Sequence, residues 1–285
     1  MASKEYASAI TTLCEIFHSK INSLYMSERC KSMKSEDMKT LTFCICTYNS
    51  AKTLRQCLRS IRDISHESRV VVVDHQSEDD TIKIVREFDA EIFFETKGLG
   101  FARQLCFDLT RSEYMVFVDG DVEIVRSDFF DLAICALNRK EYGAVVGMAV
   151  GHRFRYGLPA SLLVLRKEDF LGEIVPDYID ARETFFIQRR LNNLKLSTLY
   201  VYDSMIHRSQ FRKFKPEWEG ANTRVLPDST AEELVSALKV IILLSLNSRN
   251  LKNILYIPIF YLKFLYGFAK PTKWLRMNRD PSGVS

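Results

Sequence analysis

The chain has 285 residues, 47% of them hydrophobic and 27% charged, and a formal net charge of +4. This composition allows a large buried core and excludes a wholly disordered chain. The small net charge argues against a protein built to grip nucleic acid, so we expect no nucleic-acid partner.

The seven cysteines follow no disulfide framework, because their number is odd and their spacing is irregular. Cys44 and Cys46 alternate on an expected strand and would face the same side of it. No second Cys or His pair at zinc spacing accompanies them, so we expect small buried thiols rather than a zinc site. Free thiols indicate a reducing compartment, and we expect a cytoplasmic protein.

Residues 1–40 are expected to form an N-terminal extension that ends in a linker. Charged side chains interrupt residues 1–30, so the sequence lacks the continuous apolar segment of a signal peptide. Residues 27–39 are polar and charged, which is typical of a linker.

From residue 41 onward, strand-like and helix-like hydrophobic patterns alternate. The expected strands are 41–47, 69–74, 90–95, 113–119, 143–150, 160–166 and 197–207. The expected helices are 50–64, 78–88, 100–110, 129–137 and 183–194, with Glu78, Asp79 and Asp80 in the first turn of the second. Short connections between these elements predict βαβ units, and therefore an α/β fold with a mostly parallel sheet flanked by helices.

Polar residues stand where several expected strands end. They are Thr47, Tyr48 and Asn49 after the first strand, Asp74 after the second, and Asp119, Gly120 and Asp121 after the fourth. In open parallel sheets, ligands bind outside these carboxyl ends. Asp119 and Asp121 would repel one another unless a hard cation such as Mg²⁺ or Mn²⁺ lay between them. Because such an ion often takes its other ligands from substrate phosphates, the pair predicts half of a metal–diphosphate site.

Four stretches carry a resemblance to family 2 glycosyltransferases of the GT-A (Rossmann-like) fold. They are TYN (47–49), VVVDHQSEDDT (71–81), KGLGFARQ (97–104) and VFVDGD (116–121), and they occur in the order and spacing of that family. The resemblance is close over residues 41–125 and looser over 126–210. It implies sugar transfer from a nucleotide-diphosphate donor, usually with inversion of configuration and usually with Mn²⁺ or Mg²⁺.

These stretches also imply which residues bind the donor and the metal. The expected nucleotide-sugar-binding residues are Thr47, Tyr48, Asn49, Asp74, Ser77, Gly100, Arg103, Asp119 and Gly120. The resemblance puts Tyr48 and Asn49 near the nucleotide base, Asp74 on the base or ribose, and Arg103 toward the donor. The expected metal ligands are Asp121, Asp119 and His207. His207 ends an expected strand. The alternative to a metal-ligand role is that His207 is an ordinary core or surface histidine.

Inverting transfer needs a carboxylate that takes the proton from the acceptor hydroxyl. The family carries an acidic pair at the start of a helix, and ARETFFIQRRL (181–191) occupies that place. Glu183 matches the first acid, but Thr184 stands where the family has aspartate. We therefore expect Glu183 to be the catalytic base, with Asp180 as the second choice. A helix-start acid favoured by the helix dipole alone is the alternative.

The last part of the chain changes character. Residues 234–246 and 253–268 are rich in Leu, Ile, Tyr and Phe, but neither reaches the ~18 uninterrupted apolar residues of a spanning helix. Basic residues follow them, at Lys270, Lys273, Arg276 and Arg279. We expect a helical tail that lies on the cytoplasmic face of a membrane, which would suit a lipid-linked acceptor. The alternative is a helical pair that packs on the domain or in an oligomer interface.

Together these expectations divide the chain into three parts. They are an extension (1–40), a GT-A domain (41–225) with a nucleotide-sugar half (41–125) and an acceptor half (126–225), and an apolar, basic tail (226–285). The expected activity is metal-dependent, inverting transfer of a single sugar from a UDP- or GDP-sugar to an acceptor hydroxyl or lipid phosphate. The Gln-x-x-Arg-Trp motif of processive synthases is absent from the sequence.

Two other functions stay open. A sugar-1-phosphate nucleotidyltransferase would have the same fold, but it would need a Gly-rich basic loop after the first strand, where the sequence reads TYNSAKTLR. A catalytically inactive, membrane-associated scaffold would explain the departure at Thr184.

Overall fold

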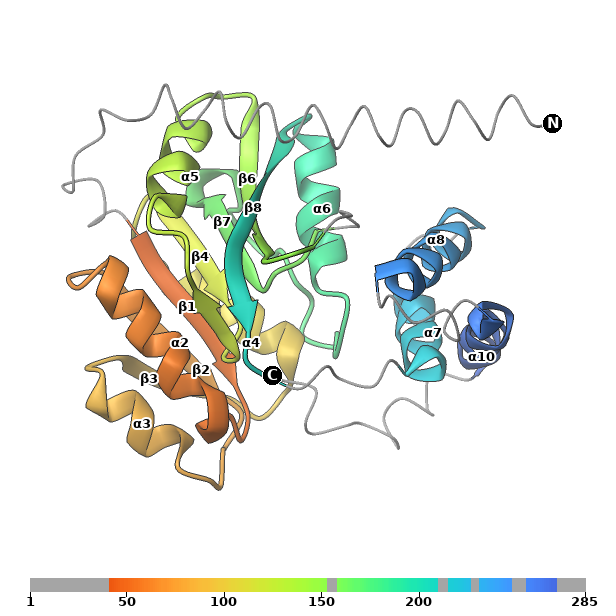
Figure 1. The fold of residues 1–285 in the computed structure, drawn as a ribbon, viewed down its shortest axis with the longest axis horizontal. Helices are drawn as coiled ribbons and strands as arrows, with labels where there is room; N and C mark the ends of the chain where they lie inside the picture. The colour runs from red at the N-terminus through yellow and green to blue at the C-terminus, as the bar shows by residue number, and fades with distance from the viewer. Residues whose placement is uncertain (1–40, 153–157, 210–214, 227–230, 248–254, 271–285) are drawn as a thin grey trace.

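The structure is a computed structural model that describes residues 41–152, 158–209, 215–226, 231–247 and 255–270. It shows a sheet with helices on both faces and a separate group of three helices beside it (Figure 1). The expected extension over 1–40 and the basic residues of 271–285 lie outside the described residues.

The elements follow the alternation that the sequence predicts. The strands are β1 (Leu41–Thr47), β2 (Arg69–Asp74), β3 (Glu91–Phe94), β4 (Tyr114–Val118), β5 (Val122–Ile124), β6 (Tyr142–Ala149), β7 (Leu162–Arg166) and β8 (Ser197–His207). The helices are α2 (Ala51–Ile64), α3 (Thr81–Glu87), α4 (Leu99–Leu109), α5 (Phe129–Leu137), the 3₁₀ turn η2 (Lys167–Asp169), α6 (Thr184–Asn193), α7 (Pro216–Val225), α8 (Ala231–Asn247) and α10 (Ile257–Ala269).

The strands form one sheet in the order β3-β2-β1-β4-β7-β6-β8-β5. Strands β3, β2, β1 and β4 are mutually parallel, and β6 is parallel to β8. Strand β7 runs antiparallel between β4 and β6, and β5 runs antiparallel on β8. The chain first builds outward from β1 to β3 and then returns to the other side of β1 with β4. This reversal creates a topological switch point between β1 and β4, where open sheets bind ligands.

Each face of the sheet carries its own hydrophobic core. On β1, Phe43 and Ile45 pack with α2 and α5, whereas Cys44 and Cys46 pack with α4 and α6 on the opposite face. This double coverage explains the near-continuous valine run of β2, which is buried on both sides. The prediction that Cys44 and Cys46 are buried thiols on one face is confirmed.

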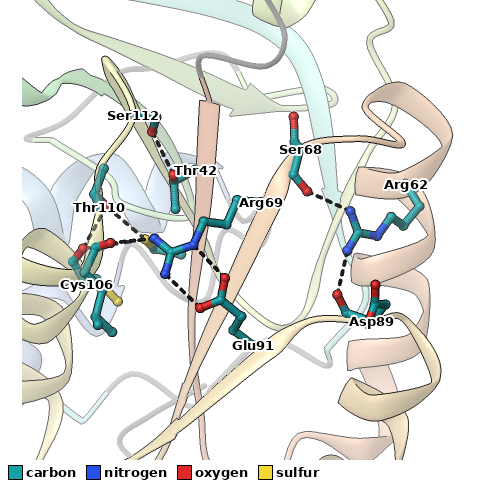
Figure 2. Close-up of polar contacts among 11 residues, drawn as sticks. Thr42, Arg62, Ser68, Arg69, Asp89, Glu91, Cys106, Thr110 and Ser112 are labelled. Carbon is teal, nitrogen blue, oxygen red and sulfur yellow. Dashed lines mark hydrogen bonds and ion pairs between the residues drawn. The ribbon is translucent and has the colours of Figure 1, made fainter.

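The amino-terminal edge of the sheet is fixed by two arginines (Figure 2). Arg69 opens β2 and makes a two-pronged ion pair with Glu91 of β3, at 2.6 and 2.8 Å, while it also donates to the carbonyl of Leu109. Arg62 of α2 donates to the backbone carbonyls of Ser68 and Asp89, at 2.8 and 3.1 Å. These contacts fix the strand starts, so the strand ends at the opposite edge have defined positions.

One local expectation, that acids occupy the first turn of the second helix, is wrong. Helix α3 begins at Thr81, so the acids of residues 78–80 precede its first turn. The Asp79 carboxylate instead accepts hydrogen bonds from the backbone amides of Ala51 and Thr81 and from the Thr81 hydroxyl. This short-range hydrogen bonding competes with helix formation, as is usual for aspartate.

Helices α7, α8 and α10 form the separate group (Figure 1). Helix α10 crosses α7 very closely at Gly220 and Gly267, where a Cβ atom would lie 1.9 Å from the Phe264 oxygen and 1.8 Å from the Glu217 oxygen, respectively. Glycine at both positions therefore permits the crossing. None of the helices in the described ranges combines the length and apolar character that crossing a bilayer requires.

Candidate functional site

The predicted site residues gather at the carboxyl ends of β1, β2 and β4. Thr47 ends β1 and is in register with Asp74 at the end of β2. Asp119 follows β4, and its amide donates to the Ser161 carbonyl at 3.0 Å. The site therefore opens at the switch point of the sheet, as the position of these residues in the sequence predicts.

Asp74 is the centre of a buried network under this edge. Its carboxylate accepts hydrogen bonds from the Thr47 hydroxyl at 2.7 Å, the Ser77 hydroxyl at 2.6 Å and the Ser77 amide at 2.7 Å. Because Asp74 is fully buried, its clear role is to hold the loops after β1 and β2 together. Its contact with a nucleotide base or ribose stays a prediction.

The loop after β1 is tied to the loop after β2 by further hydrogen bonds. The Asn49 amide donates to the Ser77 hydroxyl at 2.8 Å, and the Glu78 amide donates to the Asn49 side chain at 2.9 Å. Asn49 has a positive φ of 48°, a conformation that asparagine tolerates better than most residues. Tyr48 is left partly exposed at the rim, with its ring edge-to-face against His75 at 5.4 Å.

Two further residues at this edge of the sheet, His75 and Glu95, are not among those predicted from the sequence. His75 Nδ1 lies 2.6 Å from Glu95 Oε1, and Glu95 is buried at the end of β3. Its other carboxylate oxygen accepts the amides of Lys97 and Gly98, at 2.6 and 2.7 Å. The pair fixes the imidazole beside Tyr48. The rule that singled out Asp74 and Asp119, a polar residue at a strand end, applies to Glu95 as well.

Arg103 of α4 connects the acids of the two halves of the site. Its Nη2 donates to Asp119 Oδ1 at 2.8 Å, and its Nε lies 3.5 Å from Glu183 Oε1. The guanidinium also stacks over the Phe117 ring, 4.7 Å from its centroid. Arg103 is almost wholly buried, and its Nε and Nη1 atoms have no hydrogen-bond partner. The predicted contact of Arg103 with the donor stays a prediction; the structure shows that it joins Asp119 to Glu183.

Glu183 reaches this position because the preceding segment is pinned to α4. The Gly100 amide donates to the Ile179 carbonyl at 2.8 Å, and a Cβ at Gly100 would lie 2.5 Å from the Pro176 oxygen. The close contact between these two segments of the chain therefore requires glycine at position 100. The predicted closeness of Gly100 to a ligand is not needed to explain why this residue is glycine. Asp180, the second choice of base, is partly buried in the loop just before α6.

Asp121 and His207 are brought together by the pairing of β5 with β8, in which Val122 faces His207. His207 Nδ1 lies 3.4 Å from Asp121 Oδ1, while the Ser209 hydroxyl donates to the other carboxylate oxygen. The hydrogen bond to Asp121 raises the pKa of His207 above its ordinary value. Burial acts to raise the pKa of Asp121, but the hydrogen bonds from His207 and Ser209 outweigh burial and lower it.

These residues fit a metal site that a substrate completes. Among the described residues, no group of three His, Cys, Asp or Glu side chains is arranged to hold a metal ion alone. Asp121 and His207 provide one oxygen and one nitrogen donor side by side, and Asp119 lies two residues away in the chain. Mg²⁺ is often bound by one or two carboxylates together with substrate phosphates and water, so a two- or three-residue set suffices.

Gly120 lies between these acids and is buried. Its carbonyl accepts a hydrogen bond from the Thr53 hydroxyl at 3.0 Å, which ties the Asp119–Asp121 turn to α2. A Cβ at Gly120 would be in ordinary contact with Ser50 at 3.6 Å, so packing does not by itself require glycine here. Its predicted role at the donor stays a prediction.

The chain is similar to known glycosyltransferases. A family model described as "Glycosyl transferase family 2" matches residues 42–213, more than half of the chain. Among curated proteins, the chain is 34% identical over 92 residues to the SPbeta prophage-derived glycosyltransferase SunS of Bacillus subtilis (strain 168), covering 31% of this chain and 21% of SunS. It is 25% identical over 139 residues to a 4,4'-diaponeurosporenoate glycosyltransferase of Staphylococcus haemolyticus, covering 46% of this chain and 37% of that protein. The match therefore spans well under half the length of either relative.

Solved structures show the same fold at low sequence identity. The mannosyltransferase PcManGT from Pyrobaculum calidifontis, in complex with GDP-Man and Mn²⁺, superposes with a TM-score of 0.56 at 18% identity, covering 96% of this chain and 90% of that one. Glucosyl-3-phosphoglycerate synthase from Mycobacterium tuberculosis, in complex with Mn²⁺, UDP and glucosyl-3-phosphoglycerate, gives 0.51 at 16% identity, covering 76% and 84%. The GT-A fold predicted from the sequence is thereby confirmed.

Proposed function

The chain belongs to glycosyl transferase family 2, and we propose that it transfers a single sugar, with inversion, from a nucleotide-diphosphate sugar to an acceptor. The reaction uses Mn²⁺ or Mg²⁺. The observation that carries this proposal is the contact of one buried arginine, Arg103, with both the metal-side acid Asp119 and the candidate base Glu183. A donor bound at the switch point would have its diphosphate near Asp119 and Asp121 and its sugar toward Glu183.

The proposed donor is a UDP- or GDP-sugar. Two solved structures of the same fold are complexes with these nucleotides and Mn²⁺, one with GDP-Man and one with UDP. In this chain, Tyr48 and His75 offer aromatic rings at the rim of the site, which suits stacking against a nucleobase.

In the proposed mechanism, Asp121, His207 and Asp119 are the residues that would hold the metal ion. When bound, the ion supplies positive charge that neutralises the departing diphosphate. Glu183 accepts the proton of the acceptor hydroxyl while the oxygen of that hydroxyl forms a bond to the anomeric carbon of the sugar. The bond from that carbon to the diphosphate oxygen breaks on the opposite face, and its electron pair leaves with the nucleotide. An acceptor that attacks through a lipid phosphate would already be ionised and would not need this proton transfer.

Calorimetric titration tests the donor and metal parts of the proposal. Purified protein is titrated with UDP, GDP and their sugars, without metal and with Mn²⁺ or Mg²⁺, beside the variants Asp121→Asn and Asp63→Asn. Asp63 is an exposed acid in the last turn of α2, at the end of that helix away from the loop after β1, and serves as the matched control. We expect metal-dependent binding of one nucleotide that is lost in Asp121→Asn and kept in Asp63→Asn.

Other outcomes have definite meanings. If no nucleotide binds with either metal, the chain keeps the fold without the activity and the inactive scaffold is the better description. If nucleotide binds equally well without metal and in Asp121→Asn, the proposed metal site is wrong.

A further inference from the structure

Apart from Lys263, helix α10 is apolar around its whole circumference, yet the described residues cover only one side of it. One side packs in a small core with α8, through Ile257, Phe260, Tyr261 and Phe264, and Phe264 is 2% exposed. An all-apolar helix is typical of a segment that is surrounded on every side, and an amphipathic helix is what a water-exposed position requires. The uncovered side therefore has the chemistry of a contact surface.

The uncovered side forms a continuous row. Ile259, Leu262 and Tyr266 recur at spacings of three and four residues, which places them on one face of α10, and Leu255 lies two residues before the helix. Leu255 is 79% exposed and Leu262 is 65% exposed. We call these four residues the α10 row. Val235 of α8, 51% exposed, adds to the apolar surface of the same helical group.

The charged side chains of the segment that carries the α10 row are all positive. From Leu255 to Lys270 the sequence contains no acidic residue, and exposed Lys263 lies next to Leu262. Lys270 follows at the end of the helix, where it pairs with Glu217 of α7 at 2.7 Å. The sequence then continues with Lys273, Trp274, Arg276 and Arg279, which lie outside the described residues.

We propose that the α10 row docks on the surface of a lipid bilayer that contains anionic headgroups. Leucine and isoleucine side chains would enter the acyl boundary, while the hydroxyls of Tyr256 and Tyr266 stay at headgroup depth, where tyrosine is enriched. Lys263 would meet the negative surface potential. A 13-residue helix is about 20 Å long, shorter than a bilayer core is thick, so it lies along the surface.

A second copy of this chain explains the row less well. If the α10 rows of two copies packed together, Lys263 of each copy would lie near the positively charged α10 of the other copy. Helix α10 carries no acid that could offset this repulsion. An anionic bilayer supplies the missing negative charge. The proposal does not depend on the transferase activity, because α10 contributes none of the residues assigned to the site.

Flotation of the full chain with vesicles tests the proposal. One vesicle set is phosphatidylcholine alone, and the other contains added phosphatidylglycerol. The double variant Ile259→Asp/Leu262→Asp is compared with the native chain and with Leu171→Asp. Leu171 is a matched control on the sheet domain, because it is 63% exposed and receives the same substitution. Nucleotide binding and circular dichroism verify that each variant is folded.

We expect the native chain and Leu171→Asp to float with anionic vesicles, and the double variant to partition about tenfold or more weakly. Lys263→Ser should weaken binding to anionic vesicles roughly fivefold and leave the weaker binding to neutral vesicles unchanged. A folded double variant that floats like the native chain overturns the proposal.

Light scattering without lipid measures the oligomeric state of the chain and so tests whether something other than a bilayer covers the α10 row. If the native chain is a dimer that the double variant breaks, and neither floats, then a second copy covers the α10 row and the proposal is wrong. It is also wrong if the native chain does not float and the double variant is strongly destabilised, because the row is then covered by another part of the same chain.

Discussion

Arg103 places a permanent positive charge between two carboxylates in a nearly water-free position. It is the closest cation to both Asp119 and Glu183 among the described contacts, at 2.8 and 3.5 Å. Removing one member of a buried ion pair costs about 3–5 kcal/mol, because the remaining charges stay buried and uncompensated. We therefore expect Arg103→Met to lower the free energy of unfolding by about 3 kcal/mol or more and to abolish sugar transfer.

Urea unfolding followed by circular dichroism measures this loss. Arg55→Met is the control, because it removes the same side chain from an exposed ion pair with Glu87 on the surface. Exposed pairs contribute little, so the control should unfold close to the native midpoint. Equal effects of the two substitutions would show that Arg103 has no special place in the site.

Glu183 and Asp180 compete for the role of catalytic base. Glu183 is buried with its carboxylate toward Arg103, whereas Asp180 lies in the loop before α6. General-base catalysis contributes about 10²- to 10⁴-fold, so Glu183→Gln should lose at least about 100-fold in turnover and keep nucleotide binding. Asp180→Asn should lose far less.

Nucleotide release from the donor, with water or acceptor as the attacking group, is the readout for both variants. Each variant is first titrated with nucleotide and Mn²⁺ to confirm an intact donor site. The opposite ranking would move the base to Asp180, and unchanged turnover in both variants would mean that neither is the base.

At the scale of elements, the crossing of α7 and α10 depends on glycine. A Cβ at Gly220 would lie 1.9 Å from a backbone oxygen of α10, so the two helices would have to separate. Alanine gains about 1 kcal/mol over glycine in a helix interior, whereas overpacking typically costs about 1–3 kcal/mol. The nearest atoms belong to the backbone of α10, which cannot change rotamer to make room for a methyl group as a side chain can. We therefore expect Gly220→Ala to be destabilising.

Gly143→Ala in β6 is the comparison for this substitution. Its nearest atoms are the flexible ends of Leu191 and Leu196, at 2.6 and 2.7 Å, which can move more cheaply than backbone. Thermal unfolding should therefore show a larger loss for Gly220→Ala. A smaller loss for Gly220→Ala would contradict the close crossing.

The ion pair between β2 and β3 predicts a pH dependence of stability. Hydrogen bonds from Arg69 lower the pKa of Glu91 in the folded chain. Its contribution is thus full above the unfolded pKa of about 4.3 and is lost as pH falls through the lower folded pKa. Glu91→Gln should be less stable than the native chain at neutral pH by at most about 1 kcal/mol, since the pair is partly exposed, and the difference should vanish in acid.

Urea midpoints measured from pH 7 downward, as far as the native chain stays folded, check this sign. Glu173→Gln is the control, because Glu173 is an exposed acid in the loop after η2. A difference that grows as the solution becomes more acidic would contradict the assigned role of Glu91.

The elements that the sequence predicts well are those whose hydrophobic period is long and unbroken. Strand β1, the valine run of β2 and helix α5 are recovered within a residue or so. Strand β5 has three residues and exists because it pairs with β8, a long-range contact that no local pattern contains. Sequence periodicity also could not show that β7 runs antiparallel, because direction depends on the path of the intervening chain.

In the site, too, some features can be predicted from the sequence and others depend on long-range contacts. Strand-end rules and the family resemblance predict Asp119, Asp121 and Glu183 as acids of the site. They do not identify Ser209 as a donor to Asp121, because that contact spans 88 residues of sequence. The full burial of Asp74 likewise follows from the packing of two loops, and only the structure shows it.

At the scale of the whole molecule, α7 joins the helical group to the sheet domain. The Arg182 side chain, one residue before Glu183, donates to the Thr223 hydroxyl of α7. Leu226, directly after α7, is buried in the same core as α4 and α6. The helical group is thus fastened beside the candidate base, and a bilayer bound by α10 would be held at a fixed relation to the site.

This fastening predicts that the sheet domain and the helical group unfold together. The chain has two tryptophans, Trp218 in α7 and Trp274 beyond the described residues, so tryptophan fluorescence reports on the C-terminal part alone. Circular dichroism reports on all elements. We expect both signals to share one thermal midpoint.

The nucleotide that binds in the calorimetric titration should, together with Mn²⁺, raise the thermal midpoints of both signals by the same amount, although its proposed site lies in the sheet domain. At a ligand concentration 100 times its dissociation constant, the free energy of unfolding rises by about 2.7 kcal/mol. For a chain of this size, each kcal/mol shifts the midpoint by roughly 2–4 °C. Asp121→Asn should show no such shift. If the ligand moves the circular dichroism transition but leaves the fluorescence transition in place, the two parts unfold independently, and α10 cannot hold the site in a fixed orientation to a membrane.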